Sequence, residues 1–202
     1  MSYVIGADEV GRGSLAGDVF VAGVMAPADL PPIEGVTDSK QVTPFNRDRL
    51  HGVLTETAGL HYRIARRTAE DIDGRGMVVC LRECFTEVIE GLLSLKLPVE
   101  RIRVDGDPLD LKVEQPIEYL VRGDSLDWVI GAASIIAKVE RDRYMTKLAD
   151  EFPGYGWARN AGYGTKEHTK GIKLRGLTTQ HRRTFCKNFM PEPEVDVFTL
   201  FS

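Results

Sequence analysis

Hydrophobic and polar residues recur with two different periods along the chain, and their order predicts an α/β protein. The segment SYVIGAD, residues 2–8, reads as a short strand and runs into the glycine-rich stretch GADEVGRGSLAG, residues 6–17. Residues 18–26, DVFVAGVMA, are apolar on both faces, which indicates a second strand in the interior of a covered sheet. The two strands form a hairpin-like pair, so the sheet is not purely parallel.

Three more strands and two long helices are expected after this pair. The strands are LHYRIAR at 60–66, RIRVDGD at 101–107 and IEYLVRGD at 117–124. Thr43 and Pro44 suit the N-cap and first position of a helix. A second helix is predicted by an apolar stripe at helical spacing, namely Met77, Leu81, Cys84, Val88, Leu92 and Leu95.

A long helix is expected from Leu126 to about Asp150, and its GAAS patch, residues 131–134, is small enough to lie close to a sheet. From Phe152 onward, glycines and aromatic residues indicate loops with short helices. The predicted fold is therefore a mixed five-stranded sheet flanked by helices, with a small helical and loop-rich C-terminal part.

Composition and cysteine content indicate the cellular compartment. The chain has 202 residues, of which 43% are hydrophobic and 28% charged, as in a soluble single domain. Its apolar runs are far shorter than the roughly 20 residues of a membrane helix, and its start does not read as a signal peptide. Cys80, Cys84 and Cys186 cannot all pair; Cys80 and Cys84, four residues apart on a predicted helix, suit small core residues in a reducing environment. We expect a cytoplasmic protein that does not enter a membrane.

Charge is unevenly distributed, although the net charge is only −4. Residues 138–187 contain 12 Lys/Arg against 5 Asp/Glu. This asymmetry suits a protein that binds a polyanion on one side and cations on another. An ordinary solvated surface explains the charges equally well.

The glycine-rich turn has two candidate interpretations. GRGSLAG, residues 11–17, follows a strand with a G-x-G-x-x-x-G spacing that resembles a dinucleotide-binding loop. Such a loop needs a helix N-terminus directly after the glycines to meet the pyrophosphate, and a strand follows here instead. Asp8 and Glu9 would also repel an anionic ligand. We therefore reject this interpretation.

A metal site is the better interpretation. Asp8 and Glu9 are expected at the end of the first strand, Asp105 at the end of the fourth and Asp124 at the end of the fifth. Strand ends gather at one edge of a sheet. Asp8 and Glu9 would point to opposite faces of a regular strand, so we expect the glycine turn to twist the chain and bring both to one place.

Four converging carboxylates would repel one another unless cations neutralised them, and oxygen ligands of this kind suit Mg²⁺ or Mn²⁺. Two such ions about 4 Å apart would support hydrolysis of a phosphodiester. Each acid taken alone is also compatible with a turn or a helix cap. It is their joint placement that favours a metal site.

These motifs resemble, in order and spacing, the type 2 ribonucleases H, the bacterial ribonuclease HII family. The resemblance extends from about Val4 to Phe185. The blocks that carry it are GADEVGRGSLAG, TDSK, VDGD, RGDS followed by GAASIIAKVERDR, YGWARNAGYGTKEH and GLTTQHRRTF.

The resemblance implies the ribonuclease H-like fold and an endonuclease that cuts 5′ to a ribonucleotide, using two divalent cations. The substrate would be an RNA/DNA hybrid or duplex DNA with a single embedded ribonucleotide, and the reaction would begin ribonucleotide removal. Its metal-binding carboxylates correspond to Asp8, Glu9, Asp105 and Asp124. A nuclease or resolvase of the same fold acting on branched DNA is one alternative, and a nucleic-acid-binding protein without activity is another.

The same resemblance assigns substrate contacts. Gly11, Arg12 and Gly13 form the turn that touches the ribonucleotide 2′-hydroxyl, which distinguishes RNA from DNA. Tyr163 corresponds to the aromatic residue that stacks on the next sugar and selects the RNA-to-DNA junction. Lys40 is expected to neutralise a phosphate.

Three further residues have weaker assignments. Lys138 and Arg182 are additional candidates for phosphate contacts, although surface solvation explains Lys138 nearly as well. His181 could transfer a proton, but a hydrogen-bonded structural histidine is the favoured interpretation.

The chain is expected to divide into a catalytic domain, residues 1–187, and a C-terminal tail, residues 188–202. The tail is either flexible or a binding segment, because PEPEVDVFTLFS is similar to short hydrophobic peptides that dock on DNA sliding clamps, without their usual glutamine. A monomer is expected.

Overall fold

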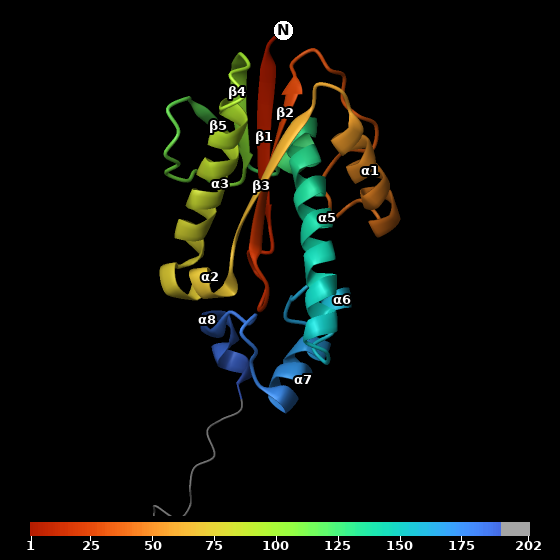
Figure 1. Cartoon of the computed structure of the whole chain (residues 1–202), viewed down its shortest axis with the longest axis vertical. Helices are drawn as coiled ribbons and strands as arrows, with labels where there is room; N and C mark the ends of the chain where they lie inside the picture. Colours follow the sequence, from red (N-terminus) through yellow and green to blue (C-terminus); the bar gives the residue numbers. More distant parts are fainter. Residues whose placement is uncertain (191–202) are drawn as a thin grey trace, which may run out of the picture.

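The computed structural model describes residues 1–190, and these form a five-stranded mixed sheet with helices on both faces (Figure 1). The strands are β1 Tyr3–Val10, β2 Val19–Pro27, β3 His61–Arg67, β4 Val99–Asp105 and β5 Ile117–Leu120. Their order is β3-β2-β1-β4-β5. β1 and β2 are antiparallel, as are β2 and β3, whereas β4 runs parallel to β1 and to β5. The predicted mixed sheet is confirmed.

Helices cover the two faces of the sheet, and the C-terminal helices lie beyond its lower end as drawn in Figure 1. They are α1 Pro44–Glu56, α2 Ala69–Arg75, α3 Met77–Leu93, α4 Gly123–Leu126, α5 Trp128–Glu151, α6 Trp157–Asn160, α7 Lys166–Arg175 and α8 Arg183–Cys186, with a 3₁₀ turn at Lys187–Phe189. The α1 helix begins as predicted, because the Thr43 hydroxyl accepts from Asn46 N and Pro44 is the first helical residue.

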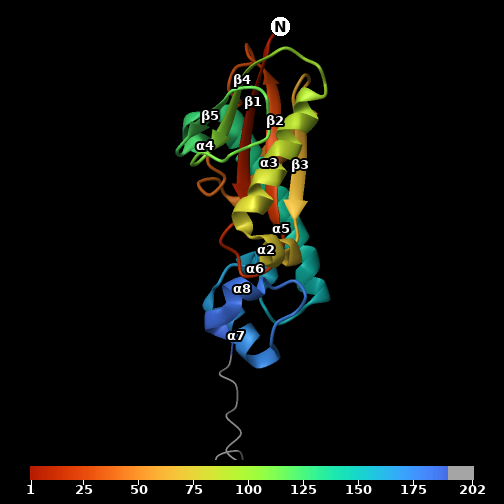
Figure 2. The same ribbon diagram turned by 90° about the vertical axis from the view of Figure 1, so that its left-hand side faces the viewer.

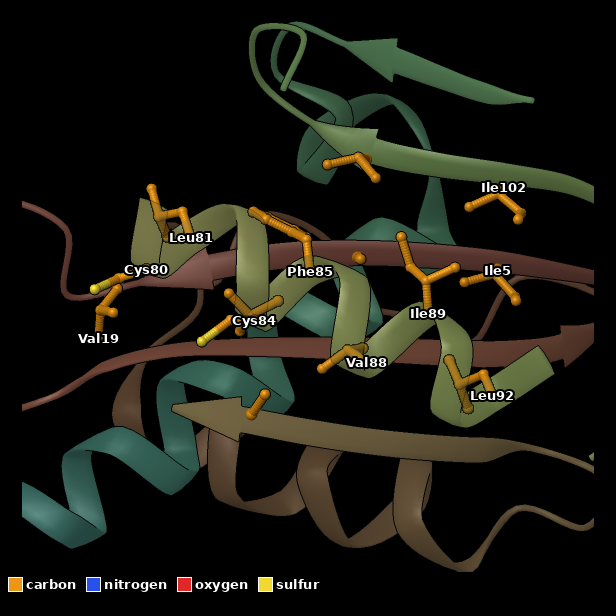
Figure 3. Packing of buried hydrophobic residues seen from close by; sticks show 14 of the residues in the cluster. Ile5, Val19, Cys80, Leu81, Cys84, Phe85, Val88, Ile89, Leu92 and Ile102 are labelled. Atoms are coloured by element: carbon orange, nitrogen blue, oxygen red, sulfur yellow. The ribbon is translucent and has the colours of Figure 1, made fainter. Parts of the chain in front are cut away.

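The α3 face holds one of the two main cores (Figure 3). Phe85, Val88 and Leu92 of α3 point toward β1 and β2 and meet apolar side chains such as Ile5. Cys84 lies in the same layer, and all three cysteines are buried and free. Cys80 and Cys84 are therefore core residues, as their spacing predicted.

The opposite face is covered by α1 and α5, and β2 serves both cores. Val21 and Met25 of β2 face α3, whereas Ala22 and Val24 face α5, so the strand is buried along its whole length. A strand covered on both faces gains from apolar residues at every position, which explains the continuous hydrophobic run of β2.

The C-terminal helices extend the molecule beyond the sheet, below it in Figure 2. They enclose a third cluster, which includes Trp157, Ile172, Met145 from α5 and Leu15 from the glycine-rich segment. Phe189 packs against this cluster as well, so packing continues past residue 187. Residues 191–202 of the predicted tail lie outside the described residues. Within residues 1–190, no helix has the length and apolarity that crossing a bilayer requires.

Two predicted boundaries were wrong. β5 ends at Leu120, and Asp124 lies in the short helix α4 instead of at the end of the strand. The long helix begins at Trp128 and not at Leu126, because the Asp127 carboxylate caps it by accepting from Val129 N and Ile130 N at 2.8 and 3.2 Å.

The α5 helix approaches β1 closely at Gly6. A Cβ atom at this position would lie 2.5 Å from Ile130 N and 2.8 Å from Val129 O, both of them helix backbone atoms. Only glycine permits this approach without moving the helix. Because Gly6 and Asp8 share one face of β1, the spacing of α5 from the sheet also sets the room around Asp8.

Replacing Gly6 tests this packing. Gly6→Ala is expected to lower the free energy of unfolding by about 2 kcal/mol, because the methyl group must displace the α5 backbone. Gly52→Ala is the matched control: it lies within α1, a Cβ there meets no described atom within 4 Å, and alanine should raise stability by about 0.5–1 kcal/mol. Urea unfolding measures both changes, and equal effects would contradict the proposed close packing.

Candidate active site

The parallel pairing of β1 and β4 brings Asp8 and Asp105 together. The last pair of this ladder is Ala7 with Val104, and both side chains lie in the α3 core. Side chains alternate along a strand, so the next residues, Asp8 and Asp105, share the α5 face. The register between β1 and β4 therefore places Asp8 and Asp105, which are almost 100 residues apart in sequence, side by side.

Asp124 completes the cluster from α4. Its ligand oxygen and those of Asp8 and Asp105 all lie within 4.8 Å of one another. Gly123 N donates to Asp105 Oδ1 at 2.6 Å, which ties the start of α4 to the end of β4. We call these three acids the carboxylate triad. Their oxygens are the donors that Mg²⁺ and Mn²⁺ prefer, so the residues present fit the divalent cations expected from the sequence.

Glu9 does not join Asp8 in the acidic cluster, although the sequence predicted that it would. Pairing of β1 with β2 is regular through Val10, so the glycine turn does not twist Asp8 and Glu9 onto one face. Glu9 consequently lies outside the carboxylate triad, and its Oε1 is 3.5 Å from Arg12 Nη1. It remains near the triad, because its charge acts on Asp8 and it is itself affected by Asp105.

The triad is electrostatically unfavourable without cations. Burial, followed by the neighbouring charge of Glu9, raises the pKa of Asp8 well above its ordinary value. Burial and then the charge of Asp105 likewise raise the pKa of Asp124. Burial also raises the pKa of Glu9, although Arg12 partly opposes this. Each shift indicates a site that favours bound positive charge.

The segment before α1 supplies a positive charge to the triad. Burial of Lys40 would lower the pKa of its ammonium group, but Asp38, Asp8 and Asp124 outweigh burial and raise it. Lys40 N also donates to Asp38 Oδ1 at 2.9 Å. Lys40 thus lies beside the carboxylates, as its expected role near a phosphate requires.

Sequence reasoning did not identify two polar residues near the triad. Ser134 of α5 is buried, its Oγ lies 3.0 Å from Ser39 Oγ, and a hydrogen bond from its hydroxyl lowers the pKa of Asp8. The charge of Asp38 and a hydrogen bond from it help to raise the pKa of Asp124. The TDSK and GAAS motifs contained both residues, but serine in GAAS was read only as a small side chain.

The turn that follows β1 is held in a special backbone conformation. Gly11 has a φ of +89°, and a Cβ there would overlap the guanidinium of Arg141. At Gly13, by contrast, a Cβ would meet no described atom within 4 Å. The Arg12 side chain is 62% exposed. In this turn Arg12 and Gly13 therefore face solvent, whereas Gly11 packs against the protein.

Tyr163 lies in a loop next to this turn and is 37% exposed. Its ring is 5.7 Å from the Arg141 guanidinium, measured to the ring centroid. Its backbone is fixed on both sides, since Tyr163 N donates to Asn160 O and Tyr163 O accepts from His168 Nδ1, at 2.9 and 3.0 Å. The loop thus holds an accessible aromatic ring at a defined position.

His168 and His181 form a buried network behind Tyr163. Because His168 Nδ1 donates to Tyr163 O, its Nε2 accepts from Trp157 Nε1 at 2.9 Å and from His181 Nε2 at 3.1 Å. His181 Nδ1 accepts from Thr178 N at 2.9 Å. Both rings are therefore neutral with assigned tautomers. This supports the structural role favoured for His181.

Two expected phosphate contacts are not supported by the geometry. Arg182 is fully buried, and its guanidinium donates to four backbone carbonyls of residues 11–17. Lys138 donates to Asp142 Oδ1 at 2.6 Å. It borders a surface pocket of about 1080 Å³, and no residue of the carboxylate triad borders that pocket. Sequence position could not reveal that Arg182 has an internal partner for its donors.

The comparisons with known proteins agree with this geometry. The family model "Ribonuclease HII" matches residues 5–188. The chain belongs to the ribonuclease HII family. Ribonuclease HII of Leuconostoc mesenteroides is 43% identical over 183 residues, which cover 91% of this chain and 70% of the relative. The crystal structure of ribonuclease H2 from Pyrococcus horikoshii has a TM-score of 0.74 and 28% identity, covering 93% of this chain and 96% of that one.

More distant ribonucleases H share the fold. The structure of the PCNA:RNase HII complex from Archaeoglobus fulgidus gives a TM-score of 0.71 at 24% identity, covering 96% and 99% of the two chains. Bst-RNase HIII in complex with Mn²⁺ gives 0.72 at 20% identity, covering 93% and 69%.

As a ribonuclease HII, the protein is an endonuclease that hydrolyses RNA in RNA/DNA hybrids. The carboxylate triad offers the oxygen ligands that Mg²⁺ and Mn²⁺ prefer. Family membership therefore confirms the fold and the reaction class expected from the sequence.

The histidine network predicts a pH dependence of stability. Burial, and then the neighbouring His168, lower the pKa of His181 from 6.5 to about 4. The unfolded chain binds this proton more readily, so the stability contributed by neutral His181 is complete above pH 6.5. It should be lost as the pH falls through 4, by about 1–3 kcal/mol.

His181→Asn keeps an acceptor for Thr178 N but cannot become charged. The stability difference between wild type and variant, measured by urea unfolding, should therefore shrink as the pH is lowered from 7.5 to 4.5. A difference that stays constant over this range would show that His181 is not held neutral by the fold.

Proposed function

We propose that the protein cleaves the phosphodiester 5′ to a ribonucleotide, in RNA/DNA hybrids and at single ribonucleotides embedded in duplex DNA, and so begins their removal. The observation that carries this proposal is the carboxylate triad next to an open glycine turn. The products would have 3′-hydroxyl and 5′-phosphate ends. Glu9, adjacent to the triad, would complete the set of four acidic residues.

In this proposal the triad and Glu9 hold two divalent cations. When bound, such ions lower the pKa of water and neutralise charge on phosphodiester oxygens. The protein's own residues orient the substrate: Lys40, which lies beside Asp8 and Asp124, would pair with a phosphate. Asp105 is held in place by Gly123 N, so its carboxylate has a fixed direction.

Two elements would recognise the ribonucleotide. The turn at Gly11, Arg12 and Gly13 is open at Gly13, where a sugar edge could approach the backbone. Its peptide groups would then contact the 2′-hydroxyl, which only RNA carries. Tyr163, exposed on the neighbouring loop, would stack on the following sugar and favour one without a 2′-hydroxyl.

The proposal is tested with a duplex that contains one ribonucleotide, incubated with Mg²⁺, Mn²⁺ or a chelator, with the product ends mapped. Asp8→Asn should reduce cleavage by about 10³-fold or more while hybrid binding persists. Because Asp8 is buried beside like charges, Asn should also leave metal-free thermal stability unchanged or higher.

Asp110→Asn, at an exposed acid after β4, serves as the control and should behave like the wild type. Near-normal turnover of Asp8→Asn would refute the assigned site. Cleavage of an all-DNA four-way junction would instead indicate a resolvase, and binding without turnover in either metal would indicate an inactive binding protein.

We also propose that the protein acts as a monomer in the cytoplasm and that residues 188–202 include a segment that binds a DNA sliding clamp. Support comes from the hydrophobic end of the tail and from the A. fulgidus relative, which was solved in complex with PCNA. The terminal residues themselves lie outside the described part of the chain.

Deleting residues 197–202 should abolish clamp binding in a pull-down or calorimetric titration, while cleavage of a short hybrid stays at the wild-type rate, because residues 1–190 carry the triad and the turn. Clamp binding that is unaffected by the deletion would end this part of the proposal.

A further inference from the structure

Two buried arginines lie beneath the elements that are proposed to recognise the ribonucleotide. Arg141 belongs to α5 and Arg182 precedes α8, and both have 0% exposed surface. We call residues 11–17 the recognition turn and residues 160–164 the tyrosine loop. We propose that Arg141 and Arg182 are positioning residues that join the recognition turn and the tyrosine loop into one rigid unit, and thereby set the selectivity for a ribonucleotide at an RNA-to-DNA junction. This inference rests on the proposed function.

Arg141 connects the two segments directly. Its Nη1 donates to Ala161 O in the tyrosine loop at 2.9 Å, and its Nη2 donates to Ala16 O in the recognition turn at 3.2 Å. Its Nε donates to Asp18 O at 2.9 Å. The same guanidinium lies against Gly11 and near the Tyr163 ring. One side chain therefore touches both proposed recognition elements.

Arg182 holds the recognition turn from its inner side. Its Nη1 lies within hydrogen-bond distance of Gly11 O, Arg12 O and Ser14 O, at 2.7, 3.0 and 3.0 Å. Nε and Nη2 both donate to Gly17 O, at 3.0 and 2.8 Å. The carbonyls of the turn thus point inward to Arg182.

The two segments are also joined through their backbones. Leu15 N and Ala16 N both donate to Gly162 O, at 2.8 and 3.3 Å. Arg182 N donates in turn to Leu15 O at 2.8 Å. The arginines therefore reinforce a contact between segments that lie almost 150 residues apart in sequence.

This arrangement is costly, which argues for a role beyond stability. Burial and the nearby Arg141 lower the pKa of Arg182 to about 9. Burial lowers the pKa of Arg141 as well. Asp18 is the acid that acts on both arginines, and its carboxylate also accepts from Tyr144 and faces Arg66. Apolar residues would usually stabilise such an interior at least as well.

A guanidinium is suited to holding geometry. Its five N–H groups diverge in one plane, so a single arginine can bind several carbonyls in fixed directions. A lysine keeps the charge but cannot span carbonyls on two segments in this way. Because the 2′-hydroxyl and the following sugar are neighbours in the substrate, the recognition turn and Tyr163 must keep a fixed spacing to read both, and a shift of about 1 Å would matter.

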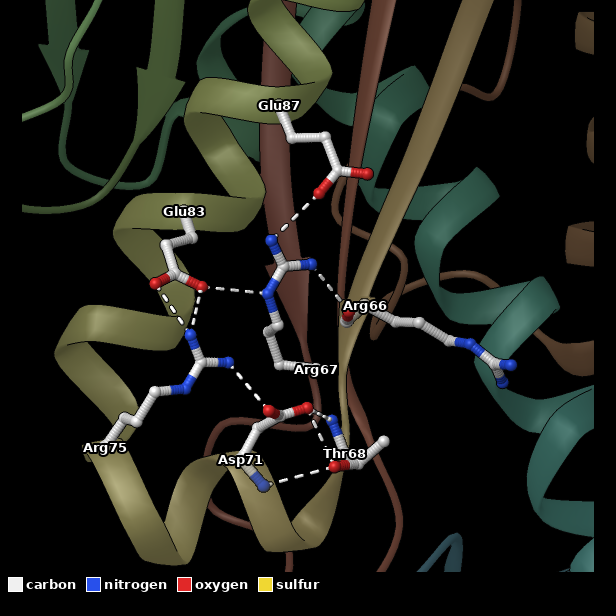
Figure 4. Close-up of polar contacts among 7 residues, drawn as sticks. All are labelled: Arg66, Arg67, Thr68, Asp71, Arg75, Glu83 and Glu87. Carbon is white, nitrogen blue, oxygen red and sulfur yellow. Dashed lines mark hydrogen bonds and ion pairs between the residues drawn. The ribbon is translucent and has the colours of Figure 1, made fainter.

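The test compares Arg141→Lys and Arg182→Lys with a control that loses an arginine elsewhere. Arg67→Lys is the control, because Arg67 joins β3 to α3 through Glu83 and Glu87, at 3.0 and 2.9 Å, within a network that contains no recognition element (Figure 4). For each protein, kcat/KM is measured on a duplex with one ribonucleotide and on a long RNA/DNA hybrid, and their ratio gives the junction selectivity.

Both test variants should lower this ratio about tenfold, and Arg67→Lys should leave it within about twofold of the wild type. Tyr163→Ala should lose the selectivity, and adding Arg141→Lys to Tyr163→Ala should lower it no further, since both act on the same feature. Hydrogen exchange at Leu15 and Ala16, whose amides bind Gly162 O, should accelerate in the test variants and not in the control.

Parallel loss of activity on both substrates, with an unchanged ratio, would overturn the inference and leave the arginines a purely structural role. Unfolding of both test variants, seen by circular dichroism, would do the same. If Tyr163→Ala retains selectivity, the proposed function of Tyr163 fails. In that case unchanged exchange at Leu15 and Ala16 in the arginine variants would overturn the rigid unit separately, whereas accelerated exchange would support it.

Discussion

The mutual repulsion of buried carboxylates is the constraint on which the rest of this structure depends. Asp8, Asp105 and Asp124 bring their oxygens within 4.8 Å, and Asp8 and Asp124 are almost fully buried. Charges at this spacing would separate if their backbones could move. The acids are therefore carried by two paired strands and by a helix whose first amide binds Asp105. Bound cations turn this repulsion into affinity.

The rigidity that the triad requires comes from the two cores on either side of the sheet. β1 and β2 contribute side chains to both cores, so the sheet cannot shift relative to α3 without disturbing α5. The α5 helix lies directly on Gly6 and presents Ser134 toward Asp8. Ordinary hydrophobic packing thus sets the geometry of a polar site at the edge of the sheet.

Opposite charges are concentrated on the two sides of the end of β1. Asp8 belongs to the carboxylate triad, whereas Gly11, three residues later, rests against Arg141 and binds Arg182. Each cluster has an opposite charge nearby, Lys40 beside the acids and Asp18 beside the arginines, but the like charges in each cluster outnumber it. Cations would compensate the acids, and a polyanionic duplex near the recognition turn would benefit from the positive field. Both unfavourable charge clusters therefore lie at the proposed metal site and the proposed substrate site.

Local patterns in the sequence determined the elements and the presence of the acids. The continuous apolar run of β2, the Thr43–Pro44 helix start and the apolar stripe of α3 each have a local physical cause, and all three were found as predicted. Tertiary structure decided which side chains meet. Regular strand pairing leaves Glu9 outside the carboxylate triad, and the folding of residues 11–17 around Arg182 buries a charge that sequence alone places at the surface. Periodicity and capping depend on neighbouring residues, whereas the partner of a long polar side chain depends on segments that only the complete fold brings together.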